Sequence, residues 1–547
     1  MSKQNINELY DFIVIGSGFG GSVSAMRLAQ KGYSVAILEA GKRWRNNDFP
    51  KSNWDLRRYF WMPLLRCFGP QAVTLLKGVM VLRGFGVGGG SLIYANTLMK
   101  PARDVFNDPR WPKGHEWDKE LSPFFDEARR MLGVVPNEKL FAAEHALHAV
   151  GKRLGVENTF HPTEVGVFFG EPDKEVDDPY FFGNGPKRVG CNHCGGCMVG
   201  CRYRAKNTLD YNYLYFAEKW GAVIFPETAA TRILPRAVNG GTTWYEVETS
   251  KPTSWFGYKN TFKARNVIIA AGVLGSVELL LKNRDVYRTL TGISSKLGFF
   301  VRTNGESLLG STSFDRKKNY SEGIAIGAAI HPDPETKIEA VRYPNGSGAM
   351  RLLSVPLTPD GSRFTRPLKL ILRMLIKLPR MLRLCFVRDW ARSTVILLVM
   401  QSVDRQMRLK LGGWFGFWPG IRGFATDRPI PSFLPVAQRA AVILACEMGG
   451  EPQNVISEVL LGTPATAHIL GGCVIGDGRE SGVIDTKHEV FGHKGLYVCD
   501  GSVIPCNLGV NPSLTISTLA ERFATQFPLR AGFSEEEYKN RLTFLAN

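Results

Sequence analysis

The hydrophobic pattern near the N-terminus predicts a strand, a helix and a second strand in close succession. The apolar run DFIVI at 11–15 is typical of a short buried strand, and SVAILE at 34–39 predicts another. Between them, VSAMRLAQKG at 23–32 has the composition of a helix. A strand, a glycine-rich turn, a helix and a strand in this order indicate a βαβ unit with a parallel sheet.

The turn of this unit has the spacing that binds a dinucleotide. Gly16, Gly18 and Gly21 form G-x-G-x-x-G, in which the first glycine makes the turn, the second lets backbone approach a pyrophosphate, and the third lets helix pack on strand. The start of the helix favours the phosphate charge. Glu39 ends the second strand, in position to hold a ribose hydroxyl and disfavour a 2′-phosphate. The unit by itself does not separate NAD from FAD.

Further runs along the chain suggest that the remaining parts of this site are scattered. GFGVGGGS at 84–91 is a second glycine-rich loop, 266–280 reads as strand, glycine and helix, and 495–502 reads as a strand ending in an acid. Two other apolar runs, 322–331 and 391–404, predict strands of a mixed sheet. We therefore expect distant segments to converge on one cofactor, with the mixed sheet as its roof.

A basic, apolar segment at 366–388 predicts an amphipathic helix that Pro379 kinks or divides. Its cations recur at steps of three or four residues within a nearly continuous run of Leu, Ile and Met: Lys369, Arg373, Lys377, Arg380 and Arg383. Such a helix suits an anionic membrane surface, and a second apolar and basic stretch lies at 56–78. Both could cover the entrance of a pocket for a lipid-like substrate. A buried helix pair with snorkelling cations is the alternative.

Composition narrows the class of protein. In 547 residues, 44% are hydrophobic and 22% charged, which excludes disordered and fibrous proteins. The net charge of +18 predicts attraction to anionic surfaces or ligands. The N-terminus lacks a charged and then apolar leader, and no uncharged apolar run reaches the ~18 residues of a spanning helix. We expect a cytoplasmic protein, peripheral at the inner membrane face if its basic segment binds there.

Four of the ten cysteines form the run C-x2-C-x2-C-x3-C, at Cys191, Cys194, Cys197 and Cys201. This spacing matches the iron–sulfur run of bacterial ferredoxins, although Arg202 stands where those proteins have proline. Zinc and structural thiols, reduced or disulfide-linked, are the alternatives. The next segment, 205–221, predicts a helix with Asn207 or Thr208 near its start.

Several motifs together resemble the glucose–methanol–choline (GMC) flavin oxidoreductases, and within them the bacterial cholesterol oxidase branch. The resemblance covers nearly the whole chain. The motifs that carry it are GSGFGG at 16–21, LEAG at 38–41, GVGGGS at 86–91, AHILGG at 467–472 and DGSVIPCNLGVNPSLTISTLAER at 500–522.

This resemblance implies FAD as the cofactor. It places the first glycine loop and Glu39 on the ADP half, Asp500 near the pyrophosphate and ribityl chain, and the Asn511–Pro512 turn beside the isoalloxazine ring. The implied cofactor-binding residues are Gly16, Gly18, Phe19, Gly20, Gly21, Glu39, Gly86, Gly89, Ser91, Asn96, Asp500, Gly501, Asn511 and Pro512.

The resemblance also implies three catalytic residues. His468 occupies the histidine position of the family's His-Pro-Leu-Gly-Gly motif, with Ile469 in place of proline, and Asn511 occupies the asparagine position of NPSLT. Glu339, in TKIEAVRYP, resembles the acidic residue of the cholesterol oxidases. The segment VRTNGES at 301–307 lies along the same site in relatives, but its Asn304 and Glu306 have no assigned role.

These residue types suit oxidation of an alcohol by a flavin, in which a hydride leaves carbon for flavin N5 while a proton leaves oxygen. A histidine handles that proton near neutral pH, and an asparagine amide fixes the oxygen without a change of charge. A carboxylate would suit proton movement within a steroid ring, from the Δ5 ketone to its conjugated isomer. We expect an FAD-dependent oxidoreductase that acts on the CH–OH group of a hydrophobic, sterol-like alcohol.

Two other functions remain open at this point. One is a dehydrogenase that passes electrons to a quinone or a protein acceptor, through an iron–sulfur cluster, instead of to O2. The other is a basic protein that binds membrane surfaces or nucleic acid and keeps a vestigial flavin. The basic stripe has few interleaved aromatic residues for base stacking, so nucleic acid is not an expected partner.

The expected fold class is α/β, with a Rossmann-like FAD-binding domain assembled from discontinuous segments. These segments are 1–100, 190–285 and 466–547. An inserted α+β substrate-binding domain takes up 101–189 and 286–465.

Overall fold

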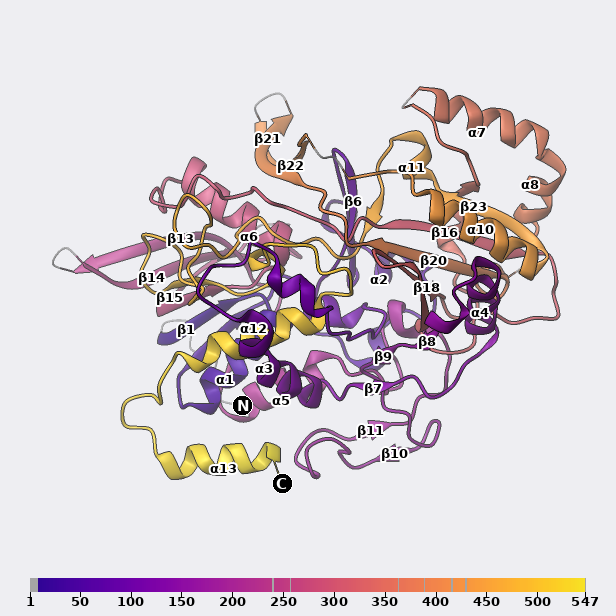
Figure 1. The fold of residues 1–547 in the computed structure, drawn as a ribbon. Helices are drawn as coiled ribbons and strands as arrows, with labels where there is room; N and C mark the ends of the chain where they lie inside the picture. Colours follow the sequence, from indigo (N-terminus) through magenta and orange to yellow (C-terminus); the bar gives the residue numbers. More distant parts are fainter. Residues whose placement is uncertain are drawn as a thin grey trace.

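Two seven-stranded sheets organise the chain (Figure 1). The structure is a computed structural model, and it describes residues 8–238, 241–255, 257–362, 364–387, 389–414, 417–427 and 430–546. One sheet carries the dinucleotide motif at its centre, and the other is mainly antiparallel and lies beside it. Together they form the frame that holds the candidate site.

The first sheet has the strand order β12-β2-β1-β15-β14-β13, with β25 also paired to β15. The bounds are β1 (Leu9–Ile15), β2 (Val35–Leu38), β12 (Val223–Phe225), β13 (Ala229–Val238), β14 (Gly241–Ser250), β15 (Lys259–Ile269) and β25 (Leu496–Val498). The strands around β1 pair in parallel, and β13 to β15 form an antiparallel meander. All four residues of β2 are buried, as a continuous apolar run in a parallel sheet predicts.

Helices cover this first sheet and fix the orientation of the glycine loop. α1 (Phe19–Gln30) packs on β1 and β2 and contacts α5 (Tyr213–Lys219) and α12 (Ser513–Thr525). α3 (Trp117–Met131) packs on α12, and α6 (Gly272–Leu281) contacts β13. Every residue of α1 is buried, so the dinucleotide motif sits at the heart of the larger hydrophobic core.

The second sheet has the order β19-β23-β16-β20-β18-β17-β8. Its strands are β8 (His161–Pro162), β16 (Ser307–Ser313), β17 (Ile326–Asp333), β18 (Thr336–Val341), β19 (Ser354–Pro356), β20 (Thr394–Gln401) and β23 (Gly450–Val455). On β20, Val395, Leu397 and Val399 pack in the core formed with α4 (Ala142–Leu154) and α10 (Pro435–Met448). The alternate residues Leu398 and Met400 belong to a separate apolar cluster on the opposite face, as the period of a strand requires.

Smaller elements connect or flank the two sheets. They are α2 (Leu56–Tyr59), β3 (Trp61–Met62), β4 (Cys67–Phe68), β5 (Gln71–Leu76), β6 (Val79–Gly84), β7 (Val135–Pro136), β9 (Glu164–Val165), β10 (Glu175–Val176), β11 (Arg188–Val189), α7 (Thr365–Ile376), α8 (Leu378–Cys385), α9 (Trp390–Ser393), β21 (Met407–Trp414), β22 (Phe417–Ala425), α11 (Ile456–Leu460), β24 (Ala465–Thr466) and α13 (Glu535–Ala546). β24 pairs with β6 and leads directly into His468, so this small sheet positions the histidine.

The expected α/β class with a Rossmann-like unit is confirmed. Every strand of the first sheet lies in the segments assigned to the FAD-binding domain, and every strand of the second lies in the inserted segments. The predicted strands 322–331 and 391–404 appear as β17 and β20. The exact domain boundaries stay a prediction.

Two local predictions differ from the structure. The helix expected over 205–221 starts only at Tyr213, capped by the side chain of Asn212, because Asn207 donates instead to the carbonyl of Leu132. Thr208 precedes a short 3-10 turn at Leu209–Tyr211. The amphipathic segment does divide in two, with Pro379 in the first turn of α8, but the buried alternative is wrong because both helices lie on the surface. Across the described residues, every helix is too short or too polar to cross a bilayer.

Candidate active site

A cavity of about 600 Å³ lies where the two sheets meet, and its wall has two distinct parts. One part is formed by the glycine loops and by short polar segments of the first sheet. The other part is apolar and comes mainly from the second sheet, from Leu308, Ile326, Val341, Ile396 and Leu398. A cofactor with many polar atoms fits the first part and a hydrophobic molecule fits the second.

The first glycine loop presents bare backbone to the cavity. A Cβ atom at Gly20 or Gly21 would collide with the backbone of Cys499 or Gly16, so the helix and sheet can approach only because both positions are glycine. At Gly18 a Cβ would meet no atom within 4 Å, because Gly18 faces the open cavity. Gly18 is also the N-cap of α1 and makes no side-chain capping bond, which leaves N–H groups of the first turn available to a phosphate.

Glu39 ties this loop to the second one. Its Oε2 accepts hydrogen bonds from the N–H (3.1 Å) and the hydroxyl (2.7 Å) of Ser17, and its Oε1 accepts from the N–H groups of Gly41 (2.8 Å) and Gly86 (3.3 Å). Burial raises the pKa of Glu39, although these four hydrogen bonds act in the opposite direction. The carboxylate lines the cavity and rigidifies the cradle around it.

The second glycine loop lines the cavity with Gly89 and is held in place by the hydrogen bonds of Ser91. Gly89 lines the cavity, and a Cβ on it would lie 2.7 Å from the Cα of Gly18, so the two loops touch through glycines. Ser91 stands behind this face, where its hydroxyl donates to the Gly88 carbonyl (2.7 Å) and accepts from the N–H of Leu209 (3.1 Å). The implied cofactor residues that do not reach the cavity wall are Gly21, Gly86, Ser91 and Asn96. They shape the cradle from behind.

Asp500 is the second buried acid of the cradle. Its Oδ1 accepts from the N–H (2.8 Å) and hydroxyl (2.6 Å) of Ser502, and its Oδ2 accepts from the hydroxyl of Ser276 in the middle of α6. Burial raises the pKa of Asp500. Gly501 follows it in the cavity wall, and the loop continues to Asn511 and Pro512.

The cradle matches the chemistry of FAD. Two glycine loops and an uncapped helix start provide room and N–H donors for a pyrophosphate, and the buried carboxylates of Glu39 and Asp500, in the same wall, would accept from hydroxyls of the cofactor. The residues that would hold the cofactor come from 16–20, 39, 89–90 and 500–513, far apart in sequence and adjacent in space.

At the junction of the two walls, His468 lies between Glu306 and Asn511. His468 Nδ1 is 2.7 Å from Glu306 Oε1, and Glu306 Oε2 accepts from the N–H of Ala467 (3.0 Å). Because Glu306 is a carboxylate acceptor, the hydrogen of the neutral imidazole resides on Nδ1. Asn511 Nδ2 lies 3.3 Å from the other ring nitrogen, Nε2, and donates to it. The imidazole therefore presents Nε2 as an acceptor.

The charge state of His468 follows from its neighbours. Burial opposes the imidazolium, but the adjacent Glu306 carboxylate and the more distant Glu339 outweigh this effect and raise the pKa of His468. The His468 side chain is 12% exposed and that of Glu306 is 1% exposed, so solvent screens their interaction little.

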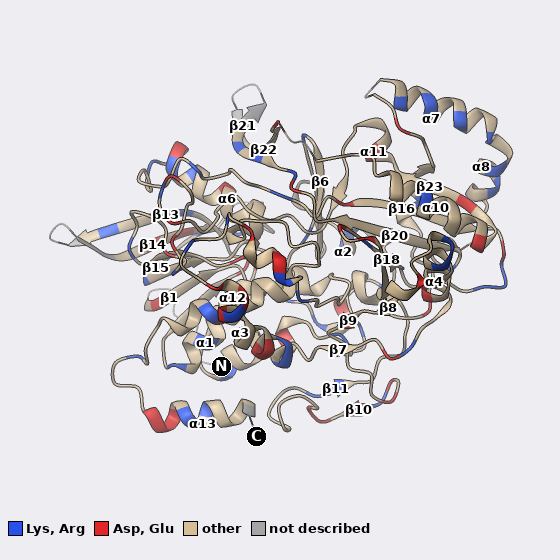
Figure 2. Cartoon of the chain, in the orientation of Figure 1, with Lys and Arg blue, Asp and Glu red and all other residues tan. Residues whose placement is uncertain are grey.

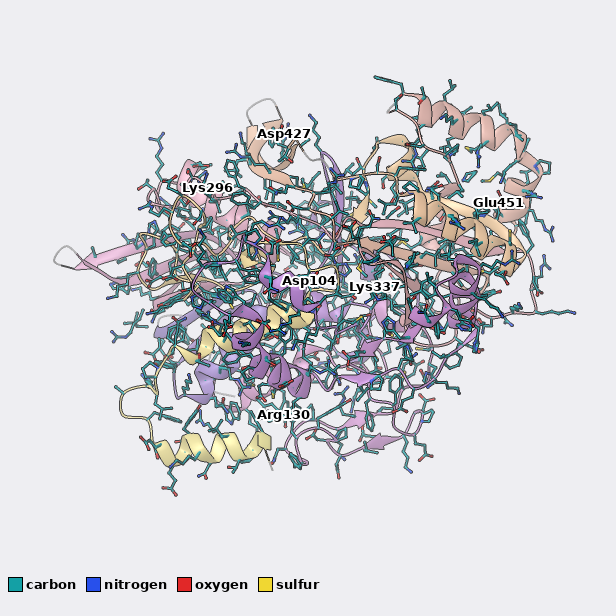
Figure 3. The ribbon with its side chains drawn as sticks, viewed as in Figure 1. Asp104, Arg130, Lys296, Lys337, Asp427 and Glu451 are labelled. Atoms are coloured by element: carbon teal, nitrogen blue, oxygen red, sulfur yellow. The ribbon has the colours of Figure 1, made fainter. Side chains whose placement is uncertain are left out.

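Glu339 lies on β18, on the far side of Asn511. Its Oε2 is 3.5 Å from Asn511 Nδ2, and its Oε1 forms an ion pair of 3.0 Å with Lys337 Nζ. Lys337 is labelled near the centre of Figure 3. Both charges are buried, and each compensates the desolvation of the other. Glu339 does not line the cavity itself and meets it through Asn511.

Asn511 is held by the backbone around it. The Nδ2 of Asn304 donates to the carbonyl of Val510 (2.8 Å), and Gln401 N–H donates to the carbonyl of Asn304 (2.7 Å). The end of β20 therefore supports the loop that carries Asn511. The Oδ1 of Asn511 is buried and has no hydrogen-bond partner, which leaves one acceptor for a bound molecule.

Two residues of this cluster, Glu306 and Lys337, could be assigned to it only from the structure. The motif around Glu306 showed that it lies near the site but not that it faces His468. Lys337 was not singled out at all. A signal existed for it, because Lys337 and Glu339 alternate on one strand whose remaining residues are apolar apart from Thr336. Two charges on one face of a buried strand are costly unless they are paired.

The predicted iron–sulfur site is not supported. Among the residues that the structure describes, no group of three or more His, Cys, Asp or Glu side chains is placed to hold a metal ion. All four cysteines of the run are free, and Cys191, Cys197 and Cys201 pack in a small apolar cluster with Val165 and Val167. Burial raises the pKa of the thiols of Cys191 and Cys197, which favours neutral thiols over the thiolates that a metal requires. Reduced structural thiols fit this packing.

Comparison with known proteins agrees with the geometry. Residues 186–283 and 446–520 match the GMC oxidoreductase family, and residues 14–45 match an NAD(P)-binding Rossmann-like domain. The chain is 42% identical to a cholesterol oxidase of Acinetobacter baumannii over 539 residues, which covers 97% of this chain and 96% of the relative. It is 43% identical to a cholesterol oxidase of Mycobacterium tuberculosis (strain H37Rv), covering 95% and 91%.

Among solved structures, pyridoxine 4-oxidase from Mesorbium loti has the same fold, with a TM-score of 0.62, 15% identity, and coverage of 95% of this chain and 99% of that one. A glycine cradle fitted to FAD, and sequence identity above 40% along nearly the whole length of curated relatives, lead to one conclusion. This chain belongs to the GMC oxidoreductase family and is an FAD-dependent alcohol oxidase.

Proposed function

We propose that this protein oxidises the hydroxyl group of a sterol-like alcohol to a ketone, with O2 as the final electron acceptor. The observation that carries the proposal is the position of His468 and Asn511 at the border between the glycine cradle and the apolar wall. A molecule with one hydroxyl on a large hydrophobic body could place its hydroxyl on this pair and its body along the wall. The cholesterol oxidases that resemble this chain act on such an alcohol.

The chain's own residues supply orientation and proton handling. Bound FAD supplies the hydride acceptor for the carbon that carries the hydroxyl. The substrate hydroxyl would replace the Asn511 N–H that donates to His468 Nε2, so that Nε2 accepts the hydroxyl proton. Glu306 stabilises the imidazolium that forms and holds the ring in the reactive tautomer. The Asn511 Nδ2–H released from His468 then donates to the substrate oxygen and fixes it.

Glu339 suits a second proton transfer, within the steroid ring. Oxidation of a Δ5 sterol yields a ketone whose double bond can move into conjugation, and this movement needs a base that takes a proton from one carbon and returns it to another. Glu339 stands beside Asn511 on β18, and its ion pair with Lys337 offsets the cost of burying its charge. We assign this step to Glu339.

The apolar wall would exclude water from the reacting atoms. Ile326, Val341 and Leu398 form one cluster there, with Met198 packed against it. Exclusion of water strengthens the hydrogen bonds of His468 and Asn511 to the substrate. The wall also sets a preference for a wide, apolar substrate over a short alcohol.

Anaerobic titration of the purified holoenzyme tests the proposal. A sterol should bleach the visible flavin absorption at equimolar addition, and a short primary alcohol at the same concentration should not. Under air, the same sterol should release one hydrogen peroxide per ketone formed. Bleaching by no alcohol would contradict an enzymatic role, and bleaching without peroxide would favour the dehydrogenase alternative. A vestigial flavin in a basic binding protein would also fail to bleach.

A further inference from the structure

The outer face of α7 and α8 is apolar and uncovered. The side chains of Leu368, Leu372, Leu375, Ile376, Leu382 and Phe386 are each more than half exposed, with Ile376 at 70%. Among the side chains of the two helices that the structure describes, the buried apolar residues are Leu370 and Leu384. Folded proteins rarely leave so many large apolar side chains in one place without a partner that covers them.

Three basic residues of the same helices, Arg366, Arg373 and Lys377, face the body of the protein and anchor the pair. Arg366 donates to the carbonyls of Ser432 (2.8 Å) and Glu458 (3.0 Å), and Arg373 donates to the carbonyl of Leu357 (2.6 Å). The pair is therefore firmly attached with its apolar side turned outward.

Glu451, on β23, completes the anchor from below α8 (Figure 3). It forms ion pairs with Lys377 and, at 3.2 Å, with Arg380. This arrangement reverses that of an ordinary surface helix, which turns its apolar stripe to the core and its charges to water. The exposed leucines are thus a consequence of specific contacts on the opposite face.

The charges around the exposed face indicate what covers it. Residues 364–386 contain six Lys or Arg and no Asp or Glu, and Figure 2 shows these cations along α7 and α8. The Arg380 side chain stays 64% exposed despite its ion pair. Arg383 stacks on Phe314, which brings the neighbouring cations of 316–318 (RKK) to the same edge. Acidic lipid headgroups complement such a rim, and acyl chains complement the apolar face.

We propose that α7 and α8 dock this protein on the surface of an anionic lipid bilayer, lying in the plane of the interface. The helices have 12 and 8 residues, too few to span a bilayer, and their apolar face can enter the boundary between headgroups and acyl chains. Docking of this kind goes beyond the oxidation reaction and does not depend on it, although a sterol-like substrate resides in such a bilayer.

Sedimentation of the holoprotein with vesicles tests this surface, with flavin absorption as a measure of folded, loaded protein. We expect wild-type protein to bind vesicles of phosphatidylcholine and phosphatidylglycerol, to bind pure phosphatidylcholine more weakly, and to be released partly by salt. L368Q/L372Q/L375Q changes one stripe of α7 and should lower the partition coefficient at least ~100-fold, since each leucine loses its burial in the bilayer.

The control F182Q/V286Q/L542Q removes three exposed apolar residues outside α7 and α8 and should bind like wild type. Since binding is measured without substrate, failure of the sterol reaction leaves this result intact. The proposal is overturned if wild type does not bind the anionic vesicles, or if the α7 variant binds as well as the control. It is also overturned if the face instead holds a stable dimer, seen by light scattering in wild type and lost in the α7 variant.

Discussion

Replacement of Glu306 by glutamine isolates the contribution of the carboxylate behind His468. The variant keeps the size of the side chain and its acceptor for Ala467 N–H, but removes the negative charge 2.7 Å from His468 Nδ1. Without that charge, the imidazolium that forms during oxidation loses its nearest counter-charge, and the tautomer with a bare Nε2 loses its main stabilisation.

The size of the effect follows from the hydrogen bond. A bond to a charged partner contributes about 1.5–3 kcal/mol, and each 1.36 kcal/mol in a barrier is a factor of ten, so kcat/KM should fall between about 10-fold and 150-fold. This range applies on the high-pH plateau, where His468 is neutral in both proteins. Both side chains are nearly buried, so solvent does not weaken the interaction much.

The pH profile gives a second, independent readout. Glu306 raises the pKa of His468, and the reaction needs the neutral imidazole as base, so activity of the wild type should rise with pH through that raised pKa. Loss of the Glu306 charge lowers this pKa, and the rising limb of the E306Q profile should therefore move to lower pH.

Steady-state oxidation of a sterol, followed by peroxide release from pH 5 to pH 10, measures both effects. Flavin content must be unchanged, and E218Q, which alters an exposed carboxylate paired with Arg43, serves as the control. An E306Q profile that superimposes on wild type, in plateau and in midpoint, would refute the assignment of His468 as the base oriented by Glu306.

Four further predictions follow from the same geometry. Asn511→Ala should lower kcat about 100-fold at unchanged flavin content, since it removes the amide that fixes the substrate oxygen; a change in KM alone would contradict this role. Glu339→Gln should leave flavin reduction by a Δ5 sterol within about threefold but slow the appearance of the conjugated enone at least 100-fold, measured by ultraviolet absorbance. Gly18→Val should weaken FAD binding while the apoprotein keeps its melting temperature, because Gly18 faces open space. In contrast, Gly20→Ala should destabilise the apoprotein by about 1–3 kcal/mol, because its Cβ collides with backbone. Thermal unfolding of the two apoproteins measures this difference. Burial raises the pKa of Glu458 to about 7 from its ordinary 4.5, so its contribution to stability is complete below pH 4.5 and is lost as pH rises through 7. In wild type, the free energy of unfolding from denaturant titrations should therefore fall by roughly 3 kcal/mol from this residue between these pH values, and in Glu458→Gln this fall should be absent.

The two acids near the reacting hydroxyl have different surroundings, and this difference suits two different proton transfers. Glu306 contacts the imidazole directly and receives a backbone N–H, so it acts on His468. Glu339 is held by Lys337, lies 3.5 Å from Asn511 and stands behind the cavity wall, so it would reach a carbon acid of the substrate where the Asn511 side chain turns aside. A comparison of the two glutamine variants on one sterol would separate oxidation from isomerisation.

Much of the fold could be predicted from local pattern. The glycine spacing after 11–15 determined a βαβ unit, because a tight turn, a phosphate-facing backbone and close helix packing each require glycine at one position. The nearly continuous apolar run of 394–401 determined a strand with two buried faces. Motif resemblance determined that His468 and Asn511 belong to one site. These features are local or carried by a motif, so the order of residues is sufficient to find them.

Only the tertiary structure decided which charges meet. Glu306 contacts His468 across 162 residues and Asn511 meets Glu339 across 172, and no periodicity encodes such pairs. The cysteine spacing suggested a metal, but packing beside valines placed the thiols in an apolar cluster. The pattern of α7 and α8 predicted an amphipathic segment without indicating which side faces the protein. Glu451 and backbone carbonyls of neighbouring segments decided that side, because a buried acceptor needs a donor and the cations of the two helices supply it. Since the cations face the protein there, the leucines face outward.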